Sequence, residues 1–214
     1  MGIPLYNRLK KQSHREIAAL QDLVVDAVYA TEENAVLHGG TAIWRCFQGQ
    51  RFSEDLDFYF KPKESFKESL GNKLKSLNAE ITKFRKTSNA IYAKVKSDRT
   101  EISLEIALRS FGKPVASEYE KADGAFIDVF TPTAEELLIE KLSAYKNRKL
   151  VRDVFDVYFL SRVVDEKKIR EKISGTLKEL PRPIDEQNLK NIVISGAIPS
   201  FDQMTEKIKA RLST

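Results

Sequence analysis

A short stretch near residue 40 constrains the fold of this chain more than any other part of the sequence. Residues 35–38 are apolar apart from the last and predict a short buried strand, which Gly39 and Gly40 end. Thr41 can cap a helix that runs from Ala42 to about Phe47. A strand, a glycine turn and a helix in this order indicate a mixed αβ core in which the turn supports a site.

The next predicted strand, Asp55–Phe60, carries a D-x-D pair. Side chains alternate between the two faces of a strand, so Asp55 and Asp57 point the same way while Leu56 and Phe58 point into a core. Carboxylates are the ligands that Mg²⁺ or Mn²⁺ prefers. The pair therefore predicts a metal site for phosphoryl or nucleotidyl transfer, although a D-x-D pair alone also fits a strand with one solvated face.

A third metal ligand is expected on another strand, Glu101–Arg109. Its apolar residues alternate, and Glu105 lies on the opposite face from them. If this strand pairs with Asp55–Phe60, Glu105 joins the two aspartates. The simpler alternative is again a strand with one face in water.

The glycine turn predicts a phosphate site. A helix that begins after Gly39 and Gly40 exposes unpaired N–H groups and a partial positive charge, which suits a triphosphate. The hydroxyl of Thr41 could add a hydrogen bond, and Arg51 and Ser53 lie in the following loop. A plain tight turn is the alternative.

Further elements complete an α+β fold. Helices are expected at residues 9–31 and 64–77, and strands at 80–86, 90–96 and 125–130. After Pro132, Thr133 and Glu136 form a capping box, and the chain is predicted helical almost to its end. The predicted organisation is a mixed-sheet core with an N-terminal helix, residues 1–131, and a helical region packed on it, residues 132–214.

Lys141 lies within the apolar stripe of the helix that follows Thr133. A lysine there is costly unless it meets an anion. The next predicted helix is apolar nearly all round, so Asp153 and Asp156 are expected to be buried. One explanation is a buried salt-bridge network in which Lys141 or Arg152 pairs with Asp153. The other is a functional site.

Taken together, the run GGTAIWRCFQGQRFSEDLDFYF resembles the signature of the AbiEii/AbiGii-type toxin nucleotidyltransferases of the DNA polymerase β-like superfamily. The later segment EKLSAYKNRKLVRDVFDVYFL is similar to the second motif of that family. The resemblance implies that Lys141 contacts the nucleotide phosphates. It also implies that Asp153 is a later acidic residue of the site, which orients Lys141 or helps to deprotonate the acceptor.

The expected activity is Mg²⁺-dependent transfer of NMP from NTP to an acceptor hydroxyl, with release of pyrophosphate. The resemblance implies a toxin of a type IV toxin–antitoxin or phage-defence system, with an antitoxin protein as partner and the 3′ end of tRNA as acceptor. The net charge of +5 permits an RNA partner. The alternatives are a small-molecule or protein acceptor, or a non-catalytic nucleotide-binding module.

Two remaining features bound the class of protein. The single cysteine, Cys46, excludes an intrachain disulfide and a zinc cluster. The absence of a signal peptide and of long apolar windows predicts a cytoplasmic protein without membrane spans.

Overall fold

The computed structural model describes residues 3–177 and 180–212, and it divides into two units. The first unit contains the chain up to Cys46 together with Ser53–Thr131. The second unit contains Phe47–Phe52 and the chain from Pro132 onward. The short segment Phe47–Phe52 thus groups with the second unit, although it lies inside the range expected for the core.

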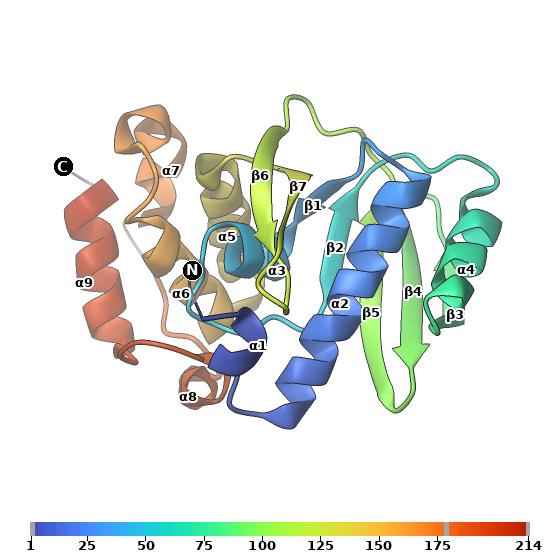
Figure 1. Ribbon diagram of the computed structural model, residues 1–214. Coiled ribbons are helices and arrows are strands. Elements are labelled where there is room, and N and C mark those ends of the chain that lie inside the picture. Colours follow the sequence, from blue (N-terminus) through green and yellow to red (C-terminus); the bar gives the residue numbers. More distant parts are fainter. Residues whose placement is uncertain (1–2, 178–179, 213–214) are drawn as a thin grey trace. The chain divides into compact units, whose positions relative to one another are not determined.

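The first unit is an α+β structure, as the sequence predicts (Figure 1). Its helices and strands are α1 (Leu5–Arg8), α2 (Gln12–Thr31), β1 (Val36–His38), α3 (Gly39–Cys46), β2 (Leu56–Tyr59), α4 (Phe66–Ser76), β3 (Glu80–Lys86), β4 (Ala90–Ser97), β5 (Thr100–Ala107), β6 (Val115–Glu120) and β7 (Phe126–Thr131). In the described residues the strands form one seven-stranded sheet in the order β3-β4-β5-β2-β1-β7-β6. The sheet is mixed, because β2 runs parallel to β5 and β1 parallel to β7, whereas the other neighbours are antiparallel.

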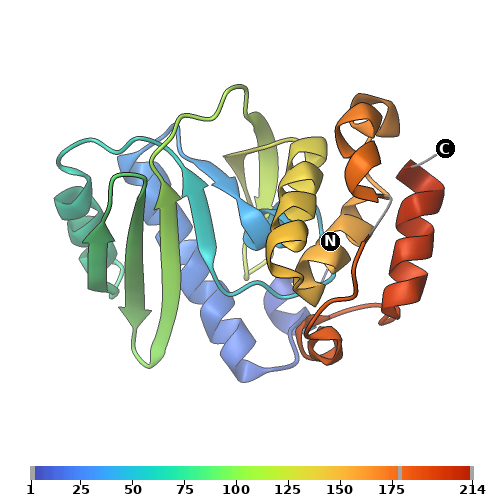
Figure 2. The same cartoon turned by 180° about the vertical axis from the view of Figure 1, so that it is seen from behind.

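One face of strands β5 and β4 is covered by helices. Alternate residues of β5, Ile102, Leu104 and Ile106, are buried in the core with residues of α2 and α4, while the residues between them are exposed. Figure 1 shows α2 crossing in front of the sheet, and Figure 2 shows the other face of β2, β5, β4 and β3, with α2 behind them. The face opposite α2 is therefore the one that carries the polar residues of these strands.

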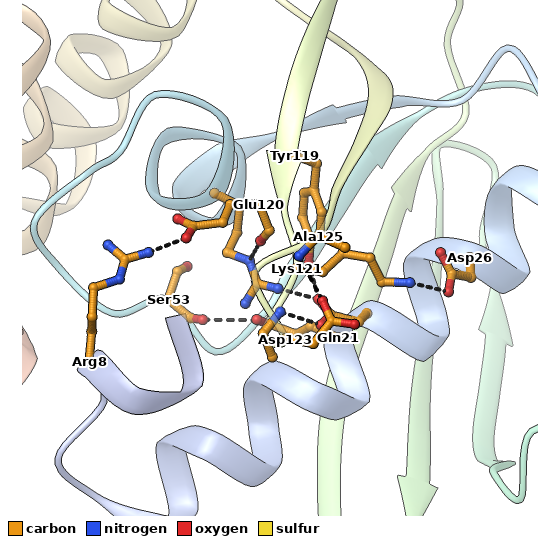
Figure 3. A network of polar contacts seen from close by, with 12 residues as sticks. Arg8, Gln21, Asp26, Ser53, Tyr119, Glu120, Lys121, Asp123 and Ala125 are labelled. Atoms are coloured by element: carbon orange, nitrogen blue, oxygen red, sulfur yellow. Dashed lines mark hydrogen bonds and ion pairs between the residues drawn. The ribbon is translucent and has the colours of Figure 1, made fainter. Parts of the chain in front are cut away.

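A buried polar cluster joins α2 to α3 and β6. Asp22 of α2 accepts hydrogen bonds from the hydroxyl of Tyr119 at 3.0 Å and the N–H of Ala122 at 2.7 Å, and it forms an ion pair with Arg45. Arg45 also donates to the carbonyl of Glu120 at 2.6 Å (Figure 3). Because breaking a buried ion pair leaves an uncompensated charge, this cluster ties the glycine-turn helix to the rest of the unit.

Two expectations about local structure are corrected, and one strand was missed. Helix α3 begins at Gly39 rather than at Ala42, so Thr41 lies inside the helix and is not its cap. Strand β2 begins at Leu56, which places Asp55 just before it. Strand β6 was not predicted, because half of its sequence, VASEYE, is polar and the strand lies at the edge of the sheet, where among the described strands it pairs with β7 alone.

The second unit is helical. It contains α5 (Ala134–Arg148), α6 (Val151–Leu160), η1 (Glu166–Lys168), α7 (Arg170–Leu177), η2 (Glu186–Asn188), α8 (Leu189–Ile192) and α9 (Phe201–Leu212). The predicted capping box of Thr133 and Glu136 is confirmed, with both of its hydrogen bonds present. None of the described helices is both long and apolar enough to cross a membrane.

Segment Phe47–Phe52 belongs to this unit through backbone contacts. The N–H of Phe52 donates to the carbonyl of Ile192 at 2.8 Å, and the N–H of Ile194 donates to the carbonyl of Gln50 at 2.9 Å. Between them, Arg51 forms an antiparallel bridge with Val193. These bonds fix the loop that joins α3 to β2 onto the second unit.

Candidate active site

Asp57 and Glu105 face each other on neighbouring strands. The predicted pairing of the two strands is confirmed, since β2 and β5 are parallel neighbours with Asp57 opposite Glu105. Asp55, Asp57 and Glu105 all line one pocket of about 280 Å³ on the open face of the sheet. Carboxylates from β2, from the residue just before it and from β5 therefore line a shared space.

The electrostatics of this pocket favour a cation. Partial burial raises the pKa of Glu105, the negative charges of Asp57 and Asp55 raise it further, and His38 opposes them. A bound divalent ion would reduce the repulsion between these neighbouring carboxylates.

As they stand, no His, Cys, Asp or Glu side chains of the described residues form a group of three that could hold one metal ion. The oxygen donors nevertheless match Mg²⁺. Asp55 and Glu105 are exposed, so their side chains can turn toward a shared ion. The pocket therefore fits a divalent cation by its donor chemistry and by the freedom of two of its carboxylates.

Gly39 packs directly against the D-x-D pair. Its φ is +73°, in the left-handed region that favours glycine. A Cβ at this position would lie 2.2 Å from Oδ2 of Asp57. The first glycine is thus required both by the turn and by the close approach of a carboxylate, and it sets the start of helix α3 beside Asp57.

The predicted phosphate-binding residues Gly40, Thr41 and Ser53 lie in the same unit. Gly39, Gly40 and Thr41 are buried, so what the turn can offer an anion is backbone N–H at the helix start. The hydroxyl of Thr41 donates to the carbonyl of Asp55 at 2.5 Å. In this structure Thr41 therefore holds the backbone of the D-x-D segment.

Gln21 of α2 holds the residues just before Asp55. Its side-chain nitrogen donates to the carbonyl of Ser53 at 2.9 Å (Figure 3) and to that of Glu54 at 3.0 Å. Together with Thr41, it binds three successive carbonyls that lead into β2. Gln21 is fully buried, so these bonds are shielded from water and position the strand that carries Asp57.

In the second unit, Arg51 and Lys141 share one buried carboxylate. Arg51 binds Asp156 through Nε and Nη2, both at 2.6 Å, and Lys141 lies 3.1 Å from the same side chain. The two cations lower the pKa of Asp156 against the opposing effect of its burial. The group carries two positive charges and one negative, so it has an excess of one positive charge.

Asp153 has a different partner. It is fully buried and binds Arg148 through both oxygens, at 2.6 and 2.7 Å. The sequence predicted the burial of Asp153 and Asp156 correctly. The partner of Lys141, however, is Asp156, and Asp153 pairs with Arg148 rather than with Lys141 or Arg152.

Two residues of this arrangement were missed at the level of sequence. Gln21 falls on the apolar face of α2, among Ala18, Val25 and Val28, so a polar residue in a buried stripe was the available signal. Tyr92 lines the carboxylate pocket on β4 and is 44% exposed. Its signal was an aromatic residue at an outward position of an alternating strand.

Comparisons with known proteins agree with the fold. A family model described as nucleotidyl transferase AbiEii toxin, type IV toxin–antitoxin system, matches residues 22–213. The nucleotidyltransferase toxin MenT4 from Mycobacterium tuberculosis H37Rv is similar in structure, with a TM-score of 0.62, 19% identity, and coverage of 94% of this chain and 83% of that chain. JHP933 from Helicobacter pylori is also similar in structure, with a TM-score of 0.64, 17% identity, and coverage of 95% of this chain and 91% of that chain. A search of curated proteins by sequence found no match.

Proposed function

Because the chain belongs to the AbiEii family of nucleotidyltransferase toxins of type IV toxin–antitoxin systems, we propose that it transfers NMP from an NTP to the 3′ hydroxyl of an RNA strand, with Mg²⁺ as cofactor. In this reaction the acceptor oxygen forms a bond to the α-phosphorus. The bond from that phosphorus to the bridging oxygen breaks, pyrophosphate leaves, and the hydroxyl proton passes to water.

The observation that carries the proposal is the convergence of Asp55, Asp57 and Glu105 on one pocket, next to the helix start at Gly39. A divalent cation, when bound, neutralises the triphosphate and stabilises the charge on the leaving pyrophosphate. The three carboxylates would hold that cation. The N–H groups at the start of α3 would bind phosphate oxygens, because a helix N-terminus attracts anions.

Lys141 remains a predicted phosphate ligand, and its surroundings in the second unit support this role. Arg51 binds both oxygens of Asp156 and can neutralise that carboxylate alone. Lys141 is the second cation on the same group, so it can exchange its partner for a phosphate without leaving a buried negative charge unpaired. Arg51 would then act on the triphosphate only indirectly, by keeping Asp156 neutralised. Asp153 would likewise not bind the triphosphate itself, and its role would be to hold the side chain of Arg148 in place.

The direct test uses the purified chain with Mg²⁺, total RNA and each labelled NTP in turn. We expect label in RNA and equimolar pyrophosphate for one or more NTPs. Asp57→Asn should lower the rate by about 100-fold or more, because the site loses charge stabilisation of the transition state. Glu54→Gln is the matched control, since Glu54 is an adjacent exposed carboxylate outside the pocket, and it should retain activity.

The outcomes separate the alternatives. Label only on protein or on a small molecule, for every NTP, would exclude RNA as the acceptor. Full activity of Asp57→Asn would exclude this pocket as the active site. Growth inhibition of a bacterial host that persists with Asp55→Ala and Asp57→Ala combined would instead indicate a non-catalytic nucleotide-binding module.

A further inference from the structure

We propose that Tyr92, Lys83 and Lys94 form the surface that receives the single-stranded 3′-terminal nucleotides of the RNA acceptor. The inference rests on the proposed function and adds to it the part of the molecule that binds the acceptor. In it, the base of a nucleotide next to the reacting end stacks on Tyr92, and Lys83 and Lys94 bind the backbone phosphates.

The pocket that holds the three carboxylates extends onto two further strands. Besides the carboxylates, Ser103 and Leu104, it is lined by Tyr92, Ala93 and Lys94 of β4 and by Lys83 of β3. One end of the pocket is therefore acidic, and the other is basic and aromatic. A cation-binding site for metal alone would not require the second end.

The register of the sheet fixes the order of these groups. Asp57 lies opposite Glu105, and Glu105 lies opposite Tyr92, so the three form one row across β2, β5 and β4. In the next row, Ser103 lies opposite Lys94, and Lys94 opposite Lys83. Adjacent strands are about 4.8 Å apart, which places Tyr92 roughly 10 Å from Asp57. One extended nucleotide can bridge such a distance.

The same order separates the donor side of the site from the acceptor side. Strand β1 and the glycine turn lie on one side of β2, and β5, β4 and β3 lie on the other. If the triphosphate binds at Gly39, its leaving pyrophosphate points toward β1. An in-line displacement brings the attacking oxygen from the opposite side, which is the side of Tyr92.

The chemistry of this end fits single-stranded RNA better than other acceptors. An unstacked base can lie on an exposed aromatic ring, which a paired base cannot do. Lysines bind phosphates as point charges. Lys94 is already held by Glu101 at 2.6 Å, whereas the described part of the chain offers Lys83 no such ion pair. Lys83 is therefore expected to contribute most of the charge.

The test measures RNA binding and nucleotidyl transfer separately on the full chain. The binding probe is a 5′-labelled single-stranded oligoribonucleotide, followed by fluorescence anisotropy without NTP. Tyr92→Ala should weaken binding by about 5- to 150-fold, the range of one lost base–aromatic stack. Tyr92→Phe keeps the ring and should stay within about 3-fold of the wild type on the same scale. The KM for NTP should not change in either variant.

Lys83→Ala should weaken binding and reduce the dependence of log affinity on log salt by about 1, as expected for one lost phosphate contact. Lys96→Ala is its matched control, because Lys96 is exposed on the same strand as Tyr92 but does not line the pocket. It should have a smaller effect on affinity than Lys83→Ala.

Two results would overturn the proposal. These are unchanged RNA affinity in Tyr92→Ala, whether or not its KM for NTP rises, and equal losses of affinity in Lys83→Ala and Lys96→Ala. A wild-type chain that binds the oligoribonucleotide in this way but releases no pyrophosphate with any acceptor would contradict the proposed function instead. The binding assay and the pyrophosphate assay thus distinguish the two failures.

Discussion

Gly39 occupies a position where any side chain would meet the carboxylate of Asp57. The positive φ and the 2.2 Å approach of Oδ2 to an added Cβ act together, so the glycine is required by two independent constraints. The turn and the D-x-D strand are therefore one structural feature. A change at Gly39 displaces Asp57, and a change in the path of β2 displaces the start of α3.

We expect Gly39→Ala to lower the free energy of unfolding by about 1–3 kcal/mol, the usual cost of a strained backbone conformation. It should also reduce nucleotidyl transfer, because Asp57 must move. Gly112→Ala is the control, since an added Cβ there meets nothing within 4 Å. Urea unfolding and the transfer assay measure the two effects. Equal stability and activity in the two variants would show that Asp57 adapts to the larger residue.

At the scale of elements, two helices position the segment that leads into β2. Gln21 of α2 binds the carbonyls of Ser53 and Glu54, and Thr41 of α3 binds that of Asp55. Asp55 lies just before β2 rather than within it. These two side chains therefore hold the backbone from Ser53 to Asp55.

Gln21→Leu should therefore raise the Mg²⁺ concentration needed for half-maximal transfer and lower kcat by about 10-fold, while the KM for NTP changes little. The matched control is Gln12→Leu, on the same helix but at an exposed site. A loss of stability with an unchanged Mg²⁺ response would mean that Gln21 is only structural. A wild-type Mg²⁺ response in Gln21→Asn would also contradict this role, because the shorter asparagine side chain is not expected to reach both carbonyls.

Helix α6 carries a buried carboxylate that neutralises cations from two other segments of its unit. Asp156→Ala should lower the free energy of unfolding by about 3–5 kcal/mol, because Arg51 and Lys141 would be left buried without their partner. Asp202→Ala removes a surface ion pair with Arg182, in which Asp202 is 72% exposed, and should change the stability little, because solvent screens exposed pairs. Comparable losses in the two variants would contradict the buried network.

The pH dependence follows from the same group. The pKa of Asp156 is lowered from its ordinary value of 3.8, because Arg51 and Lys141 stabilise its charge. A lowered pKa adds stability above the unfolded-state value, and that stability is lost as the pH falls through the folded-state value. Unfolding experiments in the acid range should therefore show a steeper loss below about pH 4 for the wild type than for Asp156→Asn. Parallel curves would show that Asp156 does not contribute.

The elements that the sequence predicts best are those with a clear periodicity. The strands at residues 80–86 and 90–96 and the capping box at Thr133 agree with the structure closely, because alternation and capping are local properties. Strand β6 lacks alternation and exists through its pairing with β7. The opposition of Asp57 and Glu105 could be expected only on the condition that their strands pair, since register depends on tertiary contacts.

In the candidate site, too, local patterns could be predicted from the sequence and long-range pairings could not. Asp55, Asp57 and Gly39 stand out because their spacing is local, whereas the pairing of Lys141 with Asp156 joins two helices and that of Arg51 with Asp156 spans 105 residues. The sequence indicated that Lys141 needs an anion, but the predicted partner, Asp153, was wrong, because Lys141 pairs with Asp156. A long-range partner is set by how the helices pack, which no short motif encodes.

At the scale of the whole molecule, the chain leaves the first unit after Cys46, returns to it at Ser53, and continues in the second unit from Pro132 onward. Segment Phe47–Phe52 lies between α3 and β2 in sequence, yet its backbone bonds and the ion pair of Arg51 belong to the helical unit. The turn helix and the D-x-D strand are thus connected through a loop that the other unit holds.

A fragment that ends at Thr131 should accordingly be less stable than the intact chain. It retains all seven strands of the sheet but leaves Arg51 without Asp156 and Phe52 without its backbone partner, Ile192. We expect a lower midpoint in thermal unfolding and faster proteolysis between residues 47 and 52 than in the full chain. Equal protection of this segment in the fragment would show that the first unit alone fixes it.

The return of the chain through Phe47–Phe52 also limits how such a gene can be recombined. A single crossover after the codon for Thr131 would join one parent's loop to another parent's helices, and Arg51 would then meet an Asp156 from a different lineage. Exchange of the helical unit between relatives requires two separate stretches of coding sequence to move together. Chimeras made at one junction are expected to fail in folding before they fail in catalysis.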